Sequence, residues 1–273
     1  MFPTFLSQTD SFTLDDAVAQ LARQEAVRGM VLVGSTGKGG ITAVSDYDLL
    51  LILNPMPVPL HVLLTTIDGR LADIIFSDEA FIEQILAREE IVPDEVVTVS
   101  KLNWLGNGRI VHDADGRISQ AQAKIAGGHW QTSVSEQEIY NVWQGIHYNY
   151  WQTRRMLLSG NVVYETAVDM RLTYMLADVW LGYFTVRHLP WRGEKEAVRY
   201  WQAHDPRFLA LFQQYQMTTE RQEKFALYRQ MAQQALAPVG GLRDEALLLV
   251  ALEGTWAMGD VATAVKFWHE LVA

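Results

Sequence analysis

Residues 31–53 read VLVGSTGKGGITAVSDYDLLLIL, and this stretch decides the expected fold of the N-terminal part of the chain. An apolar run leads into a glycine-rich turn, and a second apolar run follows two aspartates. Asp46 and Asp48 are two residues apart, so in a strand their side chains point to the same side, roughly 7 Å apart along the backbone. Two such carboxylates beside a loop of backbone N–H groups are typical of a site for a divalent metal ion and polyphosphate.

The composition is that of a packed protein rather than a disordered one. At 273 residues the chain can form one large domain or two ordinary ones, and 49% of its residues are hydrophobic against 20% charged. Its formal net charge of -10 argues against a general nucleic-acid binder and suits a cationic small molecule as partner. The chain has no cysteine, which excludes disulfides, zinc ribbons and cysteine nucleophiles.

The sequence lacks targeting and membrane signals. Its first residues, MFPTFLSQTD, have neither the basic start nor the apolar core of a signal peptide. The longest apolar run, Leu172 to Val186, is too short to span a bilayer and contains Asp178, so it predicts a buried helix. We therefore expect a soluble, cytoplasmic protein with no membrane association.

The first 125 residues alternate helical and strand patterns. A helix is expected from Thr13, which is a suitable N-cap, and the continuous apolar run Leu49 to Leu53 predicts a strand covered on both faces. Asp68-Gly69 separates two β-branched runs, which favours a hairpin, with a helix as the alternative for the first run. A helix over Glu79 to Arg88 and a short strand within Asn107 to Arg117 follow. This order predicts a mixed-sheet α/β domain over residues 1–125.

Residues 126–273 show helical patterns and no convincing strand. Tyr164 to Val186 predicts a long apolar helix, and Asp205-Pro206 supplies an N-cap and first-turn proline for another. Thr219 with Gln222 is expected to form a capping box. We therefore predict a two-domain α+β protein whose second domain is an all-α helical bundle.

Two common phosphate-binding patterns do not fit the glycine-rich turn. The Walker pattern requires a lysine and then Ser or Thr after its second glycine, but Gly40 and Ile41 occupy these positions. The dinucleotide pattern GxGxxG is missing, and the acidic residues come too soon after the turn. What remains is a Gly-Ser turn, ten residues, and then Asp-x-Asp.

This remaining pattern resembles the nucleotidyltransferase superfamily, which has the polymerase-beta-like fold. In that superfamily a third carboxylate lies on a neighbouring strand, a few tens of residues after the Asp-x-Asp pair. Asp73, within the apolar run LADIIF, meets this expectation, although an ion pair with a basic neighbour is the alternative for it. The resemblance covers about Met30 to Phe76.

The resemblance implies residues that bind the nucleotide. Gly34 and Ser35 would contact the β- and γ-phosphates of ATP or another nucleoside triphosphate, because a small residue lets the backbone approach them. Lys38 would add a positive charge, with a solvated loop position as the alternative. Lys195 follows a glycine-led turn similar to one in the helical domains of several small-molecule nucleotidyltransferases. It would reach the phosphates, or alternatively it begins a surface helix.

The resemblance also implies a metal site. Asp46 and Asp48 would bind two Mg²⁺ ions, one carried in with the nucleotide and one that lowers the pKa of the acceptor hydroxyl. Asp73 would complete the second ion site and act as general base. The acceptor hydroxyl would attack the α-phosphate in line, and pyrophosphate would leave.

We expect an enzyme that transfers a nucleoside monophosphate, AMP from ATP in the first instance, to a hydroxyl of a small molecule. The two-domain architecture resembles the aminoglycoside nucleotidyltransferases of antibiotic resistance, whose helical domain forms one wall of the acceptor site. Glu165 is the candidate for a substrate-facing acid there, with a plain solvated position as the alternative. A homodimer is compatible with this expectation.

A different function is the alternative. Regulatory nucleotidyltransferases, such as antitoxins, modify a Tyr, Ser or Thr of a partner protein by AMPylation. Proteins of this kind are usually short, so the additional helical half of this chain counts against them. A nucleotide-binding scaffold without catalysis is a third hypothesis, and the intact carboxylates count against it.

Overall fold

The computed structural model describes residues 13–37, 42, 44–128, 130, 134–243 and 248–273 of the chain. The chain divides into two compact units, Met1–Thr132 and Ser133–Ala273. Trp130, which is 5% exposed, packs into the core of the first unit, and its indole N–H donates to the carbonyl oxygen of Ile125. This contact explains why the first unit extends a few residues beyond the predicted end of the α/β domain.

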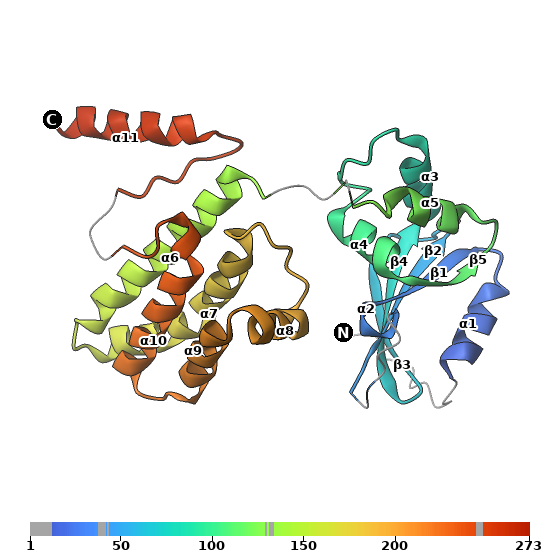
Figure 1. Cartoon of the computed structure of the whole chain (residues 1–273), viewed down its shortest axis with the longest axis horizontal. Helices are drawn as coiled ribbons and strands as arrows, with labels where there is room; N and C mark the ends of the chain where they lie inside the picture. Colours follow the sequence, from blue (N-terminus) through green and yellow to red (C-terminus); the bar gives the residue numbers. More distant parts are fainter. Residues whose placement is uncertain (1–12, 38–41, 43, 129, 131–133, 244–247) are drawn as a thin grey trace. The chain divides into compact units, whose positions relative to one another are not determined.

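The first unit contains a five-stranded mixed sheet with the strand order β3-β4-β2-β1-β5 (Figure 1). The strands are β1 (Val27–Val33), β2 (Tyr47–Leu53), β3 (Val62–Ile67), β4 (Arg70–Asp78) and β5 (Arg109–Asp113). β1 is antiparallel to β2 and β5, and β3 is antiparallel to β4. β2 and β4 are parallel. The predicted α+β class, with a mixed-sheet part followed by a helical part, is confirmed.

Helices cover both faces of this sheet. α1 (Leu14–Ala22) lies on one face and α3 (Glu79–Ala87), α4 (Val99–Asn107) and α5 (Arg117–Ile125) lie on the other, while α2 (Gly34–Gly37) directly follows β1 (Figure 1). In β2, Leu49 is buried on the α1 side and Leu50 on the side of the other three helices. This alternation explains why the strand is apolar at consecutive positions.

Two turns in this unit show how local sequence sets the fold. Asp68 and Gly69 both have positive φ, 54° and 69°, which is the geometry of a tight hairpin turn between β3 and β4. The hairpin prediction is confirmed, and the alternative of a helix for the first run is wrong. The helices α4 and α5 were not predicted. Asp113, at the end of β5, accepts the backbone N–H groups of Ile118 and Ser119 and so caps α5 from a distance in sequence.

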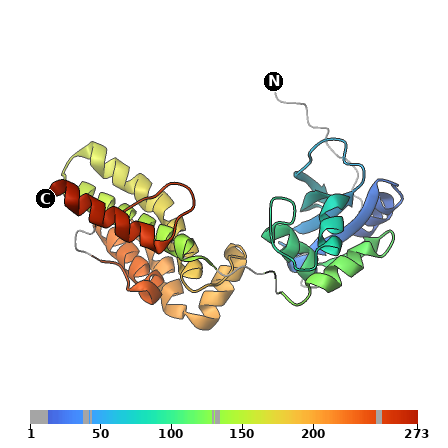
Figure 2. The ribbon, with the colours of Figure 1, turned by 90° about the horizontal axis from the view of Figure 1, so that it is seen from above.

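Among its described residues the second unit contains helices and connecting loops but no strand. Its helices are α6 (Glu136–Leu157), α7 (Val162–Thr185), α8 (Glu194–His204), α9 (Pro206–Met217), α10 (Arg221–Ala235), the 3₁₀ turn η1 (Ala237–Val239) and α11 (Met258–Val272). α6 and α7 lie side by side in both views (Figures 1 and 2). Gly182 allows this approach, because a Cβ there would lie 2.7 Å from Cγ1 of Val142. No described helix is both long enough and apolar enough to cross a bilayer.

The helix starts of this unit confirm one capping prediction and correct another. The side chain of Asp205 accepts the N–H of Phe208 at 3.1 Å, and α9 begins at Pro206 as predicted. The Thr219 capping box is wrong. α10 begins one residue later than that motif requires, and Glu220 is its N-cap, accepting the N–H groups of the two residues that follow Arg221.

A C-terminal segment, Leu242 to Trp256 excluding residues 244–247, is bound along one side of α6. Three α6 side chains donate to its backbone carbonyls: Trp151 to Arg243 at 3.2 Å, Tyr140 to Val250 at 3.0 Å and Gln137 to Gly254 at 3.2 Å. These residues recur at helical spacing and therefore form one stripe on α6. We call this segment the C-terminal strap.

His147 lies on the same stripe of α6 and is completely buried. Its Nε2 accepts the backbone N–H of Arg243 at 3.0 Å, and its Nδ1 lies 2.7 Å from the carbonyl oxygen of Trp143. Since a backbone N–H can only donate, Nε2 carries no proton and Nδ1 donates to Trp143. The imidazole is therefore neutral and holds the strap on α6.

Candidate functional site

Two of the predicted site residues are neighbours on adjacent strands. Asp48 in β2 and Asp73 in β4 are partners in the parallel ladder. Paired residues of adjacent strands share a face of the sheet and lie about 4.8 Å apart at the backbone. Leu50 and Ile75, two residues further along each strand, are buried on the side of α3, α4 and α5. The two carboxylates therefore begin the same face, before it becomes apolar.

Gly34 lies against one of these carboxylates. It follows β1 directly, has φ of +64°, and a Cβ at its position would lie 2.2 Å from Oδ2 of Asp48. Both the positive φ and this close approach require glycine. The expected approach of the backbone at Gly34 was to a phosphate and stays a prediction; the close approach in the structure is to the Asp48 carboxylate.

The carboxylate of Asp73 has an unusual environment. Its Oδ1 atom is buried and has no hydrogen-bond partner among the described residues. A buried polar atom without a partner costs on the order of 1–3 kcal/mol, so such atoms often mark a place where a ligand or ion binds. The oxygen donors of Asp48 and Asp73 are of the kind that Mg²⁺ prefers. A divalent cation of this type thus fits the pair.

Asp46 is the third predicted metal ligand. It lies just before β2 and is half-buried. Among the described residues, no three His, Asp or Glu side chains are gathered closely enough to hold a metal ion. Asp46, Asp48 and Asp73 are therefore not a preformed three-carboxylate cluster, and the ready-made part of the site is the pair on β2 and β4.

The turn that carries Asp46 is held by a neighbouring arginine. Nη1 of Arg70, at the start of β4, donates to the carbonyl oxygens of Thr42 at 2.6 Å and Ser45 at 3.1 Å. The Ser45 hydroxyl oxygen accepts the N–H of Thr42 at 2.9 Å, which closes the turn. Arg70 was not among the residues predicted from the sequence. Its position directly after the Asp68-Gly69 turn was the available signal.

The predicted phosphate-binding residues of the first unit are only partly described. The backbone of Ser35 belongs to α2, whereas Lys38 lies outside the described residues. Gly37 ends α2 and packs tightly on β1, because a Cβ there would lie 2.4 Å from the carbonyl oxygen of Leu32. The Gly-Ser turn is thus a short helical turn seated on the end of β1.

Of the two candidates in the helical unit, Lys195 is exposed and Glu165 is partly exposed. Lys195 is the second residue of α8. Glu165, near the start of α7, forms an ion pair with Arg221 at 3.3 Å, and its side chain is 41% exposed. Arg221 also makes two 2.8 Å contacts with Asp169, and this hydrogen bonding lowers the pKa of Asp169. Glu165 therefore belongs to a surface ion-pair cluster.

This cluster borders a polar pocket of about 590 Å³ in the helical unit. The pocket lies where α7 faces the end of α9 and the start of α10. Its lining residues are Asp169, Leu172, Thr173, Gln216, Thr218, Thr219, Glu220, Arg221 and Lys224. The lining mixes both signs of charge, so the pocket is suited to a polar molecule rather than an apolar one.

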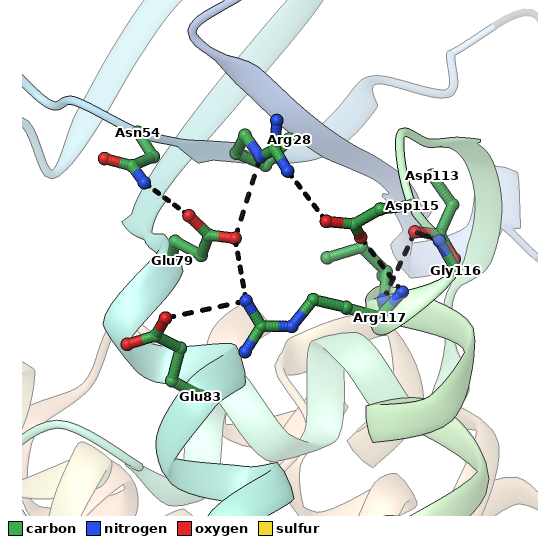
Figure 3. A network of polar contacts seen from close by, with 9 residues as sticks. Arg28, Asn54, Glu79, Glu83, Asp113, Asp115, Gly116 and Arg117 are labelled. Atoms are coloured by element: carbon green, nitrogen blue, oxygen red, sulfur yellow. Dashed lines mark hydrogen bonds and ion pairs between the residues drawn. The ribbon is translucent and has the colours of Figure 1, made fainter.

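The opposite end of the sheet carries an ion-pair network with a structural role (Figure 3). Glu79, at the start of α3, contacts Arg28 of β1 at 3.6 Å and Arg117 of α5 at 3.1 Å, and it accepts a hydrogen bond from Asn54 after β2. Arg28 also pairs with Asp115 at 2.7 Å. Because its members come from five different segments, this network ties the helices to the sheet away from the acidic pair.

Comparison with known proteins finds only a weak similarity of fold. No protein-family model matches the chain, and no curated protein matches it. Among solved structures, the chain is similar to a nucleotidyltransferase-like protein from Exiguobacterium sibiricum 255-15, with 11% sequence identity and a TM-score of 0.38. The match covers 82% of this chain and 76% of that chain. No residue role is carried over from it.

Proposed function

We propose that the first unit is a magnesium-dependent nucleotidyltransferase domain that transfers a nucleoside monophosphate, in the first instance AMP from ATP, to a hydroxyl group. The observation that supports this most strongly is the pairing of Asp48 and Asp73 in adjacent parallel strands. Gly34 lies against the first carboxylate, and the second has a buried oxygen without a described partner. The Gly-Ser turn and the Asp-x-Asp order of the sequence agree with this function.

In this proposal Asp48 and Asp73 hold the metal ions, and Asp46 joins them when nucleotide binds. Mg²⁺ bound there would neutralise charge on the triphosphate and lower the pKa of the acceptor hydroxyl. Asp48 and Asp73 lie side by side on β2 and β4, so their negative charges would attract the cation that accompanies a polyphosphate. Two ions are the expected number.

The chain's own residues supply positioning and a proton acceptor. The backbone N–H groups at Gly34 and Ser35 would hold the β- and γ-phosphates so that the acceptor oxygen faces the α-phosphorus. A bond forms between that oxygen and phosphorus, the bond to the bridging oxygen breaks, and pyrophosphate leaves. Asp73 would take the proton of the hydroxyl. Lys38 and Lys195 are further candidates for phosphate contacts.

The acceptor is proposed to be a small cationic molecule, such as an aminoglycoside-like antibiotic. The net charge of -10 favours a cationic partner electrostatically. In the helical unit, Glu165 and Asp169 are half-exposed carboxylates that share Arg221 beside the polar pocket. An ammonium group of the acceptor would replace the arginine as their partner.

The experiment is a measurement of pyrophosphate release. The full chain is incubated with Mg²⁺ and each nucleoside triphosphate, across a panel of aminoglycosides and lincosamides, and release that depends on the acceptor is expected. Asp48→Asn should abolish it while circular dichroism stays unchanged, and Asp15→Asn, at an exposed position of α1, should leave it intact. An Asp48→Asn protein as active as the wild type would exclude the metal assignment.

A protein acceptor is the alternative outcome of the same experiment. If no small acceptor releases pyrophosphate, radioactive ATP can be added to the chain together with proteins co-expressed in the source cells. Labelling of a Tyr, Ser or Thr hydroxyl on one of them would then identify an AMPylating enzyme. Absence of release and of labelling would contradict nucleotidyl transfer of either kind.

A further inference from the structure

Asp46 lies between two residues whose positions are fixed by side chains of other segments. We infer that Arg70 is a positioning residue for the proposed metal site, because it holds the turn that immediately precedes Asp46. The inference rests on the proposed function, since it concerns the same metal ions. It assigns a role to a residue that lies outside the predicted set of ligands.

Arg70 fixes the backbone immediately before Asp46. One guanidinium nitrogen donates to two carbonyl oxygens, those of Thr42 and Ser45, and hydrogen bonds from a charged donor are about twice as strong as neutral ones. Ser45 is 8% exposed, so this contact is shielded from water on the side of the turn. The peptide group that links Ser45 to Asp46 is therefore held by β4.

The residue after Asp46 is fixed as well. Tyr47 is the first residue of β2, and its hydroxyl donates to Oδ2 of Asp68 at 3.0 Å. The same oxygen accepts the backbone N–H of Leu14 at the start of α1, at 3.1 Å. The guanidinium of Arg70 also lies over the Tyr47 ring, 6.0 Å from its centroid. Arg70 thus contacts the residues on both sides of Asp46.

This arrangement explains how the carboxylate of Asp46 can be separate from the Asp48 and Asp73 pair and still contribute to the proposed metal site. Among the described residues the three aspartates do not form a closed cluster. Because the backbone is held on both sides of Asp46, its side-chain torsions are the remaining degrees of freedom through which its carboxylate would reach Asp48 and Asp73 in the proposed metal site. Rotating a side chain orders fewer degrees of freedom than ordering a turn whose backbone is not held.

The test is a direct measurement of metal binding. Mn²⁺ is titrated into the full chain in the presence of a non-hydrolysable ATP analogue, and free Mn²⁺ is followed by electron paramagnetic resonance. We expect Arg70→Gln to raise the dissociation constant of Mn²⁺ about tenfold, the scale of one charge-assisted hydrogen bond. Arg70→Lys should give an intermediate value. Arg23→Gln, at the exposed C-terminal end of α1, should bind as the wild type does.

Circular dichroism and thermal melting separate this role from a merely structural one. A variant that is less stable but binds Mn²⁺ like the wild type would overturn the inference for Arg70 and leave the proposed function standing. If Arg70→Gln does not fold, Tyr47→Phe removes the hold on the other side of Asp46 and is expected to weaken binding a few-fold; unchanged binding by it and by Arg70→Lys would equally overturn the inference. A wild-type chain that binds no Mn²⁺ would refute the proposed metal site and the role of Arg70 together.

Discussion

Replacing His147 by phenylalanine should loosen the C-terminal strap from α6 and abolish a pH dependence that we expect of the wild-type chain. The substitution keeps an aromatic ring among the neighbouring tryptophans Trp143 and Trp151, whose rings are 4.2 Å and 6.1 Å away. It removes the acceptor for the backbone N–H of Arg243. The strap would then be held by its remaining hydrogen bonds to Tyr140 and others on the stripe.

The direction of the pH effect follows from the buried neutral ring. Burial lowers the pKa of His147 below its ordinary value of 6.5. The hydrogen bond to Trp143 opposes this by a smaller amount, and the positive charge of Arg243 adds a still smaller lowering. As the pH falls below about 6.5, the unfolded or detached state takes up a proton before the bound state does. The contribution of His147 is thus fully present above pH 6.5 and is lost as the pH falls toward its lowered pKa.

The size of the expected loss of protection follows from the backbone N–H of Arg243, which loses its acceptor. Leaving a part-buried donor without its acceptor costs about 1–3 kcal/mol, so the local opening equilibrium should shift roughly 5- to 150-fold. Hydrogen exchange measures this opening directly. We expect the protection factor of the Arg243 amide, corrected for intrinsic exchange, to fall by that ratio in His147→Phe at pH 7.5. In the wild type the same factor should fall between pH 7.5 and pH 5.

Tyr140→Phe is the matched control for this experiment. It removes the hydrogen bond to the carbonyl of Val250, which does not titrate in this range, so it should lower protection without adding a pH dependence. The reasoning would be refuted if wild-type protection at Arg243 were the same at pH 5 and pH 7.5. A His147→Phe chain with the wild-type pH profile would refute it as well.

Three further tests, two of them with a matched control substitution, address other parts of the structure. Gly34→Ala and Gly69→Ala each place alanine at positive φ, at a cost of about 1 kcal/mol. Only the first also collides with the facing carboxylate, so it alone should weaken Mn²⁺ binding, about tenfold or more; equal losses in both would contradict the close approach. Glu79→Ala should lower the free energy of unfolding in urea by about 1–3 kcal/mol, because it leaves two arginines without their shared carboxylate. Glu83→Ala, whose side chain is 58% exposed, should change it by less than about 0.5 kcal/mol. Tyr228→Phe removes a buried hydroxyl without a described partner and should leave stability unchanged or raise it, whereas a loss above about 1 kcal/mol would show a partner.

Prediction from the sequence worked best for features that depend on contacts within a single segment. β2 could be predicted because strands buried on both faces are apolar at every position, and the turn at Asp68-Gly69 because few residues accept positive φ. The start of α9 at Pro206 could be predicted because its N-cap and first-turn proline are adjacent in sequence. These features depend on contacts within a few residues.

Features that depend on distant segments could not be predicted. The helix α5 begins at Arg117 after a glycine that provides no side-chain cap, and its N–H groups are satisfied by Asp113 of the preceding strand. Arg70 of β4 holds the turn before Asp46, and no local sequence pattern predicts that contact. The start of α10 was misplaced because threonine is a preferred N-cap and glutamate is not, yet the carboxylate of Glu220 accepts the first N–H groups of the helix.

The candidate site also has features that could be predicted from the sequence and features that could not. That Asp48 and Asp73 belong together was predicted from a resemblance, and the parallel pairing of β2 with β4 places them side by side. The separate position of Asp46, outside the strand, was not expected, because the strand was assumed to include Asp46, whereas β2 begins at Tyr47. Glu165 was chosen as a candidate from its place in a helix, and its ion pair with Arg221 depends on α10.

The parallel register of β2 and β4 has a consequence for how this gene can tolerate insertions and deletions. The ladder, and not the length of the connection, sets which residue faces Asp48, so codons added or removed within residues 54–61 would leave the acidic pair intact. Removing one residue between Gly69 and Asp73 would turn the carboxylate to the α1 side of the sheet, because strand side chains alternate. Natural variants should therefore differ in the length of the first segment while the second keeps its length.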